Sequence, residues 1–143
     1  MASKASAVWT GSLKEGKGTI TTATGVLSNA NYSFATRFEG AATGTTPEEL
    51  IAAAHAGCFS MALGAQLGGA GLKPAKIETH AAVTLGKVGE GFAITRIALT
   101  TTASVPGATP EVFAKAAADA KAGCPISKLF AGNTEILLDA KLV

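Results

Sequence analysis

The chain has little cysteine, little charge and few aromatic side chains. Two cysteines among 143 residues exclude the disulfide framework that stabilises many small secreted domains. Charged residues make up 15%, and twelve scattered Lys and Arg face ten Asp and Glu, so no basic stripe indicates a nucleic-acid partner. Residues 1–6 lack the apolar core of a signal peptide, and we therefore expect a cytoplasmic protein.

Long hydrophobic runs are also scarce, although 48% of the residues are apolar, which excludes intrinsic disorder. Much of this share is alanine. Only Leu50–Leu72 approaches the roughly 18 apolar residues of a membrane span. That segment contains His55, Gln66 and several glycines, so we expect a buried core helix and no membrane partner. The length is that of one domain, predicted over residues 1–143.

Turn, cap and periodicity signals divide the chain into strands and helices. The expected strands are a hairpin over 6–23, then 32–38, 76–85, 92–104 and 134–142. The expected helices, each beginning at a capping residue or proline, are 47–68, 110–123 and 125–130. The order is not a repeating β-α-β, and it predicts an α+β fold: a mainly antiparallel β-sheet with a long central helix and a second helix.

The two cysteines are the first candidates for chemistry. Cys58 lies inside the expected long helix, where a buried structural thiol is the plain alternative. Cys124 lies at the expected start of a helix, where unpaired N–H groups and the helix dipole favour a thiolate. A small capping residue is the alternative there. The two are 66 residues apart and would form a reversible disulfide only if the fold brings them together.

Arginine is rare, which draws attention to Arg37 and to the acidic residues that follow it. Arg37 is either a charge at a strand edge or a guanidinium that lowers a thiol pKa and binds an oxygen leaving group. Glu49 can complete a capping box, which leaves Glu48 free to orient Arg37. Glu48 and Cys58 are about 15 Å apart along one helix. One arginine cannot easily touch both in one chain, so a shared site indicates a second subunit.

His55 lies three residues before Cys58 and shares its helical face. A general base, a metal ligand and a packed, hydrogen-bonded histidine are the three alternatives for it. The chain has two histidines and no Cys-x-x-Cys motif, so we predict no metal site.

Four segments together resemble one known family. They are 47–61 (PEELIAAAHAGCFSM), 121–127 (KAGCPIS), 32–40 (YSFATRFEG) and 91–95 (GFAIT). In residue type and order they are similar to the OsmC/Ohr family, the osmotically inducible protein C and organic hydroperoxide resistance proteins, over nearly the whole chain. The OsmC branch is favoured by His55, where the Ohr branch tends to carry tyrosine, and by the placement of Arg37.

The resemblance implies a thiol-dependent peroxidase without metal, flavin or other cofactor, built as an OsmC-like intertwined homodimer. It matches Cys58 to the peroxidatic cysteine, Cys124 to the resolving cysteine, Arg37 to the activating arginine and Glu48 to its carboxylate partner. Each site of such a dimer takes its cysteines from one chain and its Arg and Glu from the other. The helix-end argument alone would make Cys124 the more acidic thiol. We follow the family, because an adjacent arginine can outweigh a helix dipole.

The predicted activity is reduction of organic hydroperoxides, and more weakly of hydrogen peroxide, to alcohols. It proceeds through a Cys58 sulfenic acid and a Cys58–Cys124 disulfide, which an external dithiol reduces. Apolar side chains near the motifs are candidates either for a pocket that binds the organic tail or for plain core: Phe38, Phe59, Met61, Ile126 and Phe130.

Two alternatives of other classes remain at this point. One is a non-catalytic module that binds a small apolar ligand, in which both thiols are structural and inert. The other is a redox sensor, which forms the same disulfide but does not turn over with a small dithiol. Thiol reactivity separates the first alternative from a peroxidase, and turnover separates the second.

Overall fold

The computed structural model describes all residues 1–143, which divide into two compact units, Met1–Leu50 and Ile51–Val143. The prediction of one domain over 1–143 stays a prediction. The long helix α2 (Pro47–Gly69) begins in the first unit and supplies most of its length to the second. The candidate residues are therefore distributed over both units.

The first unit is a small antiparallel sheet followed by a short helix. Strands β1 (Ala5–Thr10), β2 (Lys17–Thr22) and β3 (Ala30–Tyr32) pair in that order, and the first two confirm the expected hairpin. Gly18 of β2 lies opposite both Trp9 and Tyr32, whose ring centroids are 5.4 Å apart. A Cβ at position 18 would collide with both rings, so the packing of this sheet requires glycine there.

The expected strand over 32–38 is wrong beyond its first residue, because Phe34–Phe38 form helix α1. Ser33 begins this helix with a reciprocal capping box. Its side-chain oxygen accepts from the Thr36 N–H at 3.2 Å, and the Thr36 hydroxyl oxygen accepts from the Ser33 N–H at 2.9 Å. Two N–H groups are thereby satisfied locally, which favours a helical turn over the loose alternation read from the sequence. Arg37 consequently lies in the last turn of a helix.

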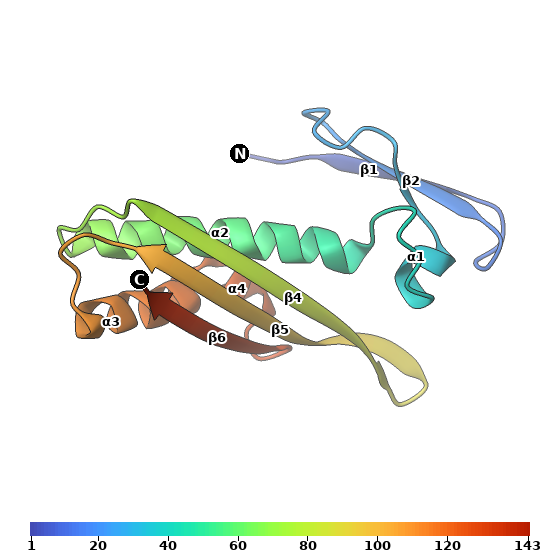
Figure 1. Cartoon of the computed structure of the whole chain (residues 1–143). Helices are drawn as coiled ribbons and strands as arrows, with labels where there is room; N and C mark the ends of the chain where they lie inside the picture. Colours follow the sequence, from blue (N-terminus) through green and yellow to red (C-terminus); the bar gives the residue numbers. More distant parts are fainter. The chain divides into compact units, whose positions relative to one another are not determined.

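The second unit packs three helices on one face of a three-stranded sheet (Figure 1). The strand order is β4-β5-β6; β4 and β5 are antiparallel, and β5 and β6 are parallel. Besides α2, the elements are β4 (Lys76–Val88), β5 (Gly91–Ser104), α3 (Pro110–Gly123), α4 (Pro125–Phe130) and β6 (Glu135–Leu142). The bounds of the three expected helices are confirmed to within one residue. The expected α+β fold class is confirmed as well.

The core of the second unit lies between the sheet and helices α2 and α3. Helix α2 contributes Phe59, Leu63 and Leu67, all with no exposed surface. The other buried apolar residues are Ile97, Leu99, Ala103, Val105, Phe113, Ala116, Ala117 and Ala120. Three apolar residues spaced by four place one stripe of α2 on the sheet, as a core helix requires.

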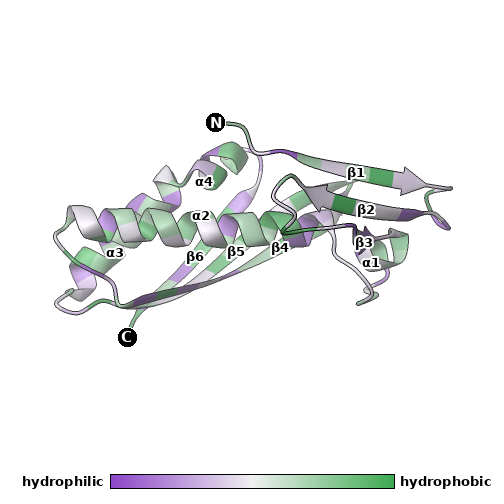
Figure 2. Ribbon diagram, turned by 90° about the horizontal axis from the view of Figure 1, so that it is seen from above, coloured by the Kyte–Doolittle hydropathy of each residue, from purple (hydrophilic) through white to green (hydrophobic).

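Helix α2 passes the test for a membrane span by length and composition alone. One such helix is weak evidence, because core helices pass the same test. Figure 2 shows α2 coloured mostly as hydrophobic or neutral. One side of α2 is buried in the core, as expected. Another side is not, since Met61 is 79% exposed. Much apolar α2 surface is thus uncovered in the single chain.

Partly buried hydroxyl groups also connect α2 to the sheet. The Ser60 hydroxyl donates to Thr79 Oγ1 at 2.8 Å, and the Thr79 and Thr101 hydroxyls are 2.9 Å apart. Thr101 in turn donates to the backbone carbonyl of Glu78 at 3.1 Å. Each of these three hydroxyl groups has a hydrogen-bond partner, so the groups can be removed from water without a large loss of stability.

Candidate active site

The fold brings the two cysteines together. Cys58 lies near the middle of α2, and Cys124 lies between α3 and α4 as the residue that precedes Pro125. Both are free thiols, and their sulfur atoms are 3.0 Å apart. A small movement of either side chain would allow a disulfide bond to form. The pair thus has the geometry that a reversible dithiol–disulfide cycle requires.

The two sulfurs differ in access to solvent. Cys124 has no exposed surface, whereas Cys58 is only partly buried. A small oxidant that arrives from solvent therefore meets Cys58 first. The difference in burial thus makes Cys58 the more accessible of the two sulfurs, whatever their acidity.

The less accessible thiol is the more acidic one, because the pKa of Cys124 is lowered and that of Cys58 is raised. Burial raises the pKa of Cys58, and its hydrogen bond with Cys124 raises that pKa further. Burial alone would also raise the pKa of Cys124. There, however, polar interactions with Cys58 and with Ser127 and Ile126 in the first turn of α4 outweigh burial, and the pKa falls. This agrees with the helix-end argument from the sequence: of the two thiols, Cys124 is the one whose surroundings favour the thiolate.

His55 and Ser127 continue this buried network. His55 Nε2 lies 2.8 Å from the Ser127 hydroxyl oxygen, although the two residues are 72 positions apart. His55 is fully buried and Ser127 is 3% exposed. Burial lowers the pKa of His55, so its ring is neutral near pH 7. The hydrogen-bonded alternative for His55 is thus the observed one.

Ser127 was not singled out as a candidate from the sequence. A signal was present, because Ser127 follows Cys124 by three residues and falls in the first turn of α4. A residue three positions after the N-cap residue of a helix lies close to that N-cap residue. Its contact with His55, in contrast, depends on how α2 and α4 pack.

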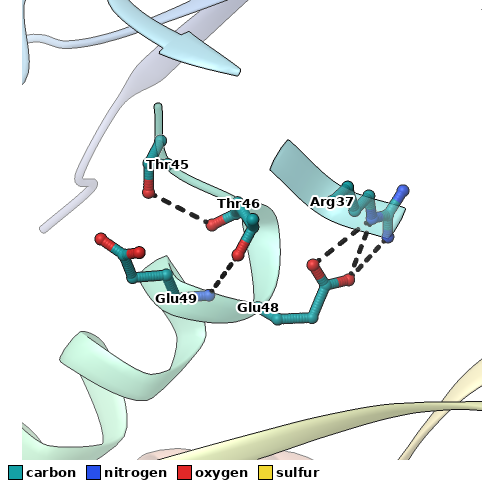
Figure 3. Close-up of polar contacts among 5 residues, drawn as sticks. All are labelled: Arg37, Thr45, Thr46, Glu48 and Glu49. Atoms are coloured by element: carbon teal, nitrogen blue, oxygen red, sulfur yellow. Dashed lines mark hydrogen bonds and ion pairs between the residues drawn. The ribbon is translucent and has the colours of Figure 1, made fainter. Parts of the chain in front are cut away.

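The first unit contains the second pair of candidates, Arg37 and Glu48 (Figure 3). Arg37 Nη2 donates to Glu48 Oε1 at 2.8 Å, and Arg37 Nε donates to the same oxygen at 3.1 Å. The Glu48 side chain is 8% exposed and that of Arg37 is 38% exposed. Arg37 Nη1 takes no part in this ion pair (Figure 3). A buried carboxylate therefore fixes the guanidinium and leaves part of it available to an incoming oxygen atom.

The start of helix α2 places Glu48 for this contact. The Thr46 hydroxyl oxygen accepts from the Glu49 N–H at 3.0 Å and so caps the helix. The full capping box expected here is wrong, since the exposed Glu49 carboxylate makes no bond back to Thr46. Water can hydrogen-bond an exposed carboxylate as well as the Thr46 N–H can, so Glu49 gains little from the contact. Glu48 is the acidic residue that turns inward, as the sequence argument proposed.

An apolar surface pocket adjoins Arg37 within the first unit. Its volume is about 200 Å³, and it is lined by Trp9, Leu13, Tyr32, Ser33, Phe34, Arg37 and Phe38. The Arg37 guanidinium also lies over the Phe38 ring, 5.4 Å from its centroid. Of the apolar candidates, Phe38 lines this pocket, whereas Phe59 belongs to the core of the second unit. The pocket combines an apolar wall with one cationic group.

The four candidate residues thus form two pairs, one in each unit. No group of three or more His, Cys, Asp or Glu side chains is arranged to hold a metal ion. Two hydrogen-bonded thiols with unequal access can undergo oxidation and disulfide formation. A fixed guanidinium beside an apolar wall can bind an oxygen atom that carries an organic substituent.

Known proteins resemble this chain in sequence or in fold. Peroxiredoxin OsmC of Escherichia coli (strain K12) is 52% identical over 139 residues, which are 97% of this chain and 95% of that protein. The organic hydroperoxide resistance protein OhrB of Bacillus subtilis superposes with a TM-score of 0.73 at 27% identity, covering 96% of this chain and 97% of that one.

A Mycoplasma pneumoniae OsmC-like protein, at 15% identity and a TM-score of 0.77, shares the fold over the whole of this chain and 98% of its own. The family model described as OsmC-like protein matches residues 40–139, well over half of the chain. This chain therefore belongs to the OsmC-like family, and its similarity to Peroxiredoxin OsmC places it on the OsmC branch.

Proposed function

We propose that this protein is a thiol-dependent peroxidase that reduces organic hydroperoxides and, more weakly, hydrogen peroxide. The observation that carries the proposal is the pair of free thiols 3.0 Å apart, one partly accessible and one buried. The printed names of the relatives, a peroxiredoxin and an organic hydroperoxide resistance protein, support it. The cycle uses no metal or flavin, and its proposed setting is the cytoplasm.

The proposed cycle has three balanced steps. The Cys58 thiolate attacks one peroxide oxygen, the O–O bond breaks, and the other oxygen leaves as an alcohol after gaining a proton. Cys124 then attacks the sulfur of the Cys58 sulfenic acid, forming the disulfide and releasing water. An external dithiol reduces the disulfide by exchange, becomes a disulfide itself and restores both thiols.

Cys58 needs a positive neighbour for the first step, because its own surroundings favour the protonated thiol. We assign this role to Arg37, held by Glu48. A guanidinium near Cys58 would draw the negative charge of the pair from Cys124 to Cys58 across the 3.0 Å contact. It would also donate a hydrogen bond to the departing oxygen.

We further propose that Arg37 and Glu48 reach Cys58 from a second copy of the chain, in a homodimer with shared active sites. Glu48 and Cys58 are separated by about 15 Å along one straight helix, more than an arginine fixed on Glu48 spans. The uncovered apolar surface of α2 also favours association of two chains.

The pocket beside Arg37 supports the substrate class. Its aromatic wall would bury the organic substituent of a hydroperoxide, which hydrogen peroxide lacks, while the peroxide oxygens contact the guanidinium. Binding of the apolar substituent then favours organic hydroperoxides over hydrogen peroxide.

The first test is a thiol count by intact mass. Reduced protein receives one equivalent of an aromatic hydroperoxide, and a parallel sample receives hydrogen peroxide. We expect both thiols to be lost, faster with the organic compound, and to return when dithiol is added, with repeated turnover. Thiols that survive would leave the ligand-binding alternative in place. A single oxidation without turnover would indicate the redox sensor.

The shared site has its own test, mixing of two inactive variants. Cys58→Ser and Arg37→Met chains are combined under conditions that allow subunit exchange. Half of the dimers are then mixed and one of their two sites has all four residues, so about a quarter of the wild-type activity should return. Sites contained within single chains would give no recovery. Two chains of the same variant, mixed in the same way, are the control.

A further inference from the structure

The buried network around Cys124 contains two groups to which the proposed cycle gives no role. Ser127 Oγ lies 2.8 Å from His55 Nε2, and Ser127 is in the first turn of α4, which directly follows Cys124. The Cys124 sulfur is 3.0 Å from that of Cys58, and the nearby Ser127 hydroxyl lowers the pKa of the Cys124 thiol. His55, Ser127 and Cys124 have at most 3% of their surface exposed. A continuous chain of polar contacts thus runs from a buried imidazole to the redox pair, with no solvent-exposed member before Cys58.

The number of available protons fixes the direction of these hydrogen bonds. Ser127 has one hydroxyl proton, and it points to Cys124 when that sulfur is the acceptor. The serine oxygen must then accept from His55 Nε2–H. A neutral imidazole carries a single N–H, so Nδ1 is left with a lone pair. Nδ1 is indeed the one buried side-chain atom without a hydrogen-bond partner.

This orphan atom is a second, independent indication of the same arrangement. An unsatisfied lone pair in the interior is less costly than an unsatisfied N–H. The imidazole is therefore expected to keep its proton on Nε2. His55 Nε2–H then points toward Ser127, and the Ser127 hydroxyl proton points toward the Cys124 sulfur. This arrangement stabilises negative charge on that sulfur.

We propose that Ser127 and His55 are positioning residues for Cys124, which they hold as the attacking and leaving sulfur in the disulfide steps. The inference rests on the proposed peroxidase function and deepens it. Cys124 is buried, so the incoming dithiol attacks the accessible Cys58 sulfur. The S–S bond breaks, and its electron pair goes to Cys124, which leaves as a thiolate. Ser127 and His55 thus act in resolution and in reduction, but not in the attack on peroxide.

The expected effect follows from two opposing changes. Loss of the Ser127 hydrogen bond lowers the acidity of the Cys124 thiol about tenfold or more, as for other bonds to charged groups. A less acidic thiolate is a stronger nucleophile, which offsets about half of that loss on a logarithmic scale. Resolution should therefore slow by roughly threefold to tenfold.

The experiment measures the two oxidation steps separately. The Cys58 sulfenic acid is trapped with dimedone, and the disulfide is counted after the remaining thiols are alkylated. In Ser127→Ala we expect sulfenic acid to form at the wild-type rate and to persist, while disulfide formation slows by roughly threefold to tenfold. His55→Leu should change the same step less, and His55→Gln, which offers a neutral N–H at the Nε2 position, should restore it.

Ser60→Ala is the matched control. It removes another partly buried hydroxyl from the second unit, one that bonds Thr79 and not Cys124. Its disulfide step should run at the wild-type rate. For the case that Ser127→Ala does not fold, Ser127→Thr and Ser127→Val provide a pair of equal size that differs in the hydroxyl alone. We then expect the threonine variant to resolve faster than the valine variant.

The outcome that overturns the proposal is disulfide formation at the wild-type rate in both Ser127→Ala and His55→Leu. A second readout does not depend on peroxide chemistry. In a Cys58→Ser background Cys124 is the only thiol, and Ser127→Ala should raise the pH at which its thiolate absorbance appears. If wild-type Cys58 resists peroxide, the proposed function fails, and this titration still decides the role of Ser127.

Discussion

The cysteine pair and the Arg37–Glu48 pair are built in opposite ways. Cys58 and Cys124 are 66 residues apart and meet beside a core of fully buried side chains. Arg37 and Glu48 are only 11 residues apart and belong to a short helix and a helix start, with the arginine 38% exposed. The sulfur pair therefore depends on the packing of the second unit, and the charge pair depends mainly on local chain geometry. In the proposed peroxidase, the packed sulfur pair would be the reaction centre and the more exposed arginine its activating group.

The largest expected effect is the loss of the first sulfur. Cys58→Ser should lower peroxide turnover by at least about a thousandfold, because the hydroxyl cannot form a sulfenic acid. The free energy of unfolding should hardly change, since the substitution is nearly isosteric and Cys58 is partly exposed. Steady-state peroxide consumption and urea denaturation measure the two quantities. Turnover at the full rate would exclude the proposed mechanism.

The next largest effect concerns the stability of the packed second unit, on which the position of the cysteine pair depends. Leu63→Ala should lower the free energy of unfolding by about 2–5 kcal/mol, because a fully buried side chain leaves a cavity. Urea denaturation followed by circular dichroism gives the value. Leu129→Ala on α4 is the matched control, and at 70% exposure it should change stability by no more than about 0.5 kcal/mol. Equal losses in the two variants would contradict the assigned core.

The third prediction separates activation from disulfide chemistry. Arg37→Met should slow peroxide reduction by about a hundredfold, since it removes the charge and the hydrogen-bond donors, and Glu48→Gln should slow it by about tenfold. Disulfide formation driven by a small chemical oxidant such as diamide should slow much less in both variants, because diamide has no departing oxygen for Arg37 to bind. Stopped-flow peroxide consumption and a thiol count check the two halves. A comparable loss with diamide would mean that Arg37 acts on the cysteine pair as a whole.

The smallest effect concerns pH. Burial lowers the pKa of His55 below its usual value of 6.5, so the unfolded chain binds a proton more readily than the folded one. Stability is therefore highest above pH 6.5 and falls as the pH decreases toward the folded pKa, by at most about 1.4 kcal/mol per pH unit. His55→Gln should flatten this slope between pH 6.5 and 5. Urea midpoints over that range provide the measurement, and an unchanged slope would contradict the assignment to His55.

The sequence predicted most of the secondary structure because its signals are local. Thr109 before Pro110 and Cys124 before Pro125 marked two helix starts, and the structure begins α3 and α4 there. The exception is the segment after Tyr32. A weak alternation suggested a strand, and the capping box of Ser33 decided for a helix. Signals of two or three residues outweigh a loose pattern where the chain is partly exposed and packing contributes little.

The candidate site was predictable to a different degree in each pair. The pairing of Glu48 with Arg37 followed from the observation that Glu48 had no other local role, and the structure shows it. That Cys58 and Cys124 approach each other was only one of the open alternatives. The sequence allows three roles for His55 and does not indicate its contact with Ser127. Contacts of 66 and 72 residues in separation depend on how helices pack, and no local pattern encodes that packing.

Without the fold, the amino-acid sequence already indicates the family, the helix starts, two cysteines as candidates for chemistry, and one arginine and one acidic residue as further candidates. Each of these is a property of short segments and of residue types. The tertiary structure alone brings the two sulfurs to 3.0 Å, buries Cys124 while leaving Cys58 partly exposed, and places a buried histidine against Ser127. Burial and hydrogen bonding set thiol acidity, and both arise when α2, α3 and α4 pack on the sheet.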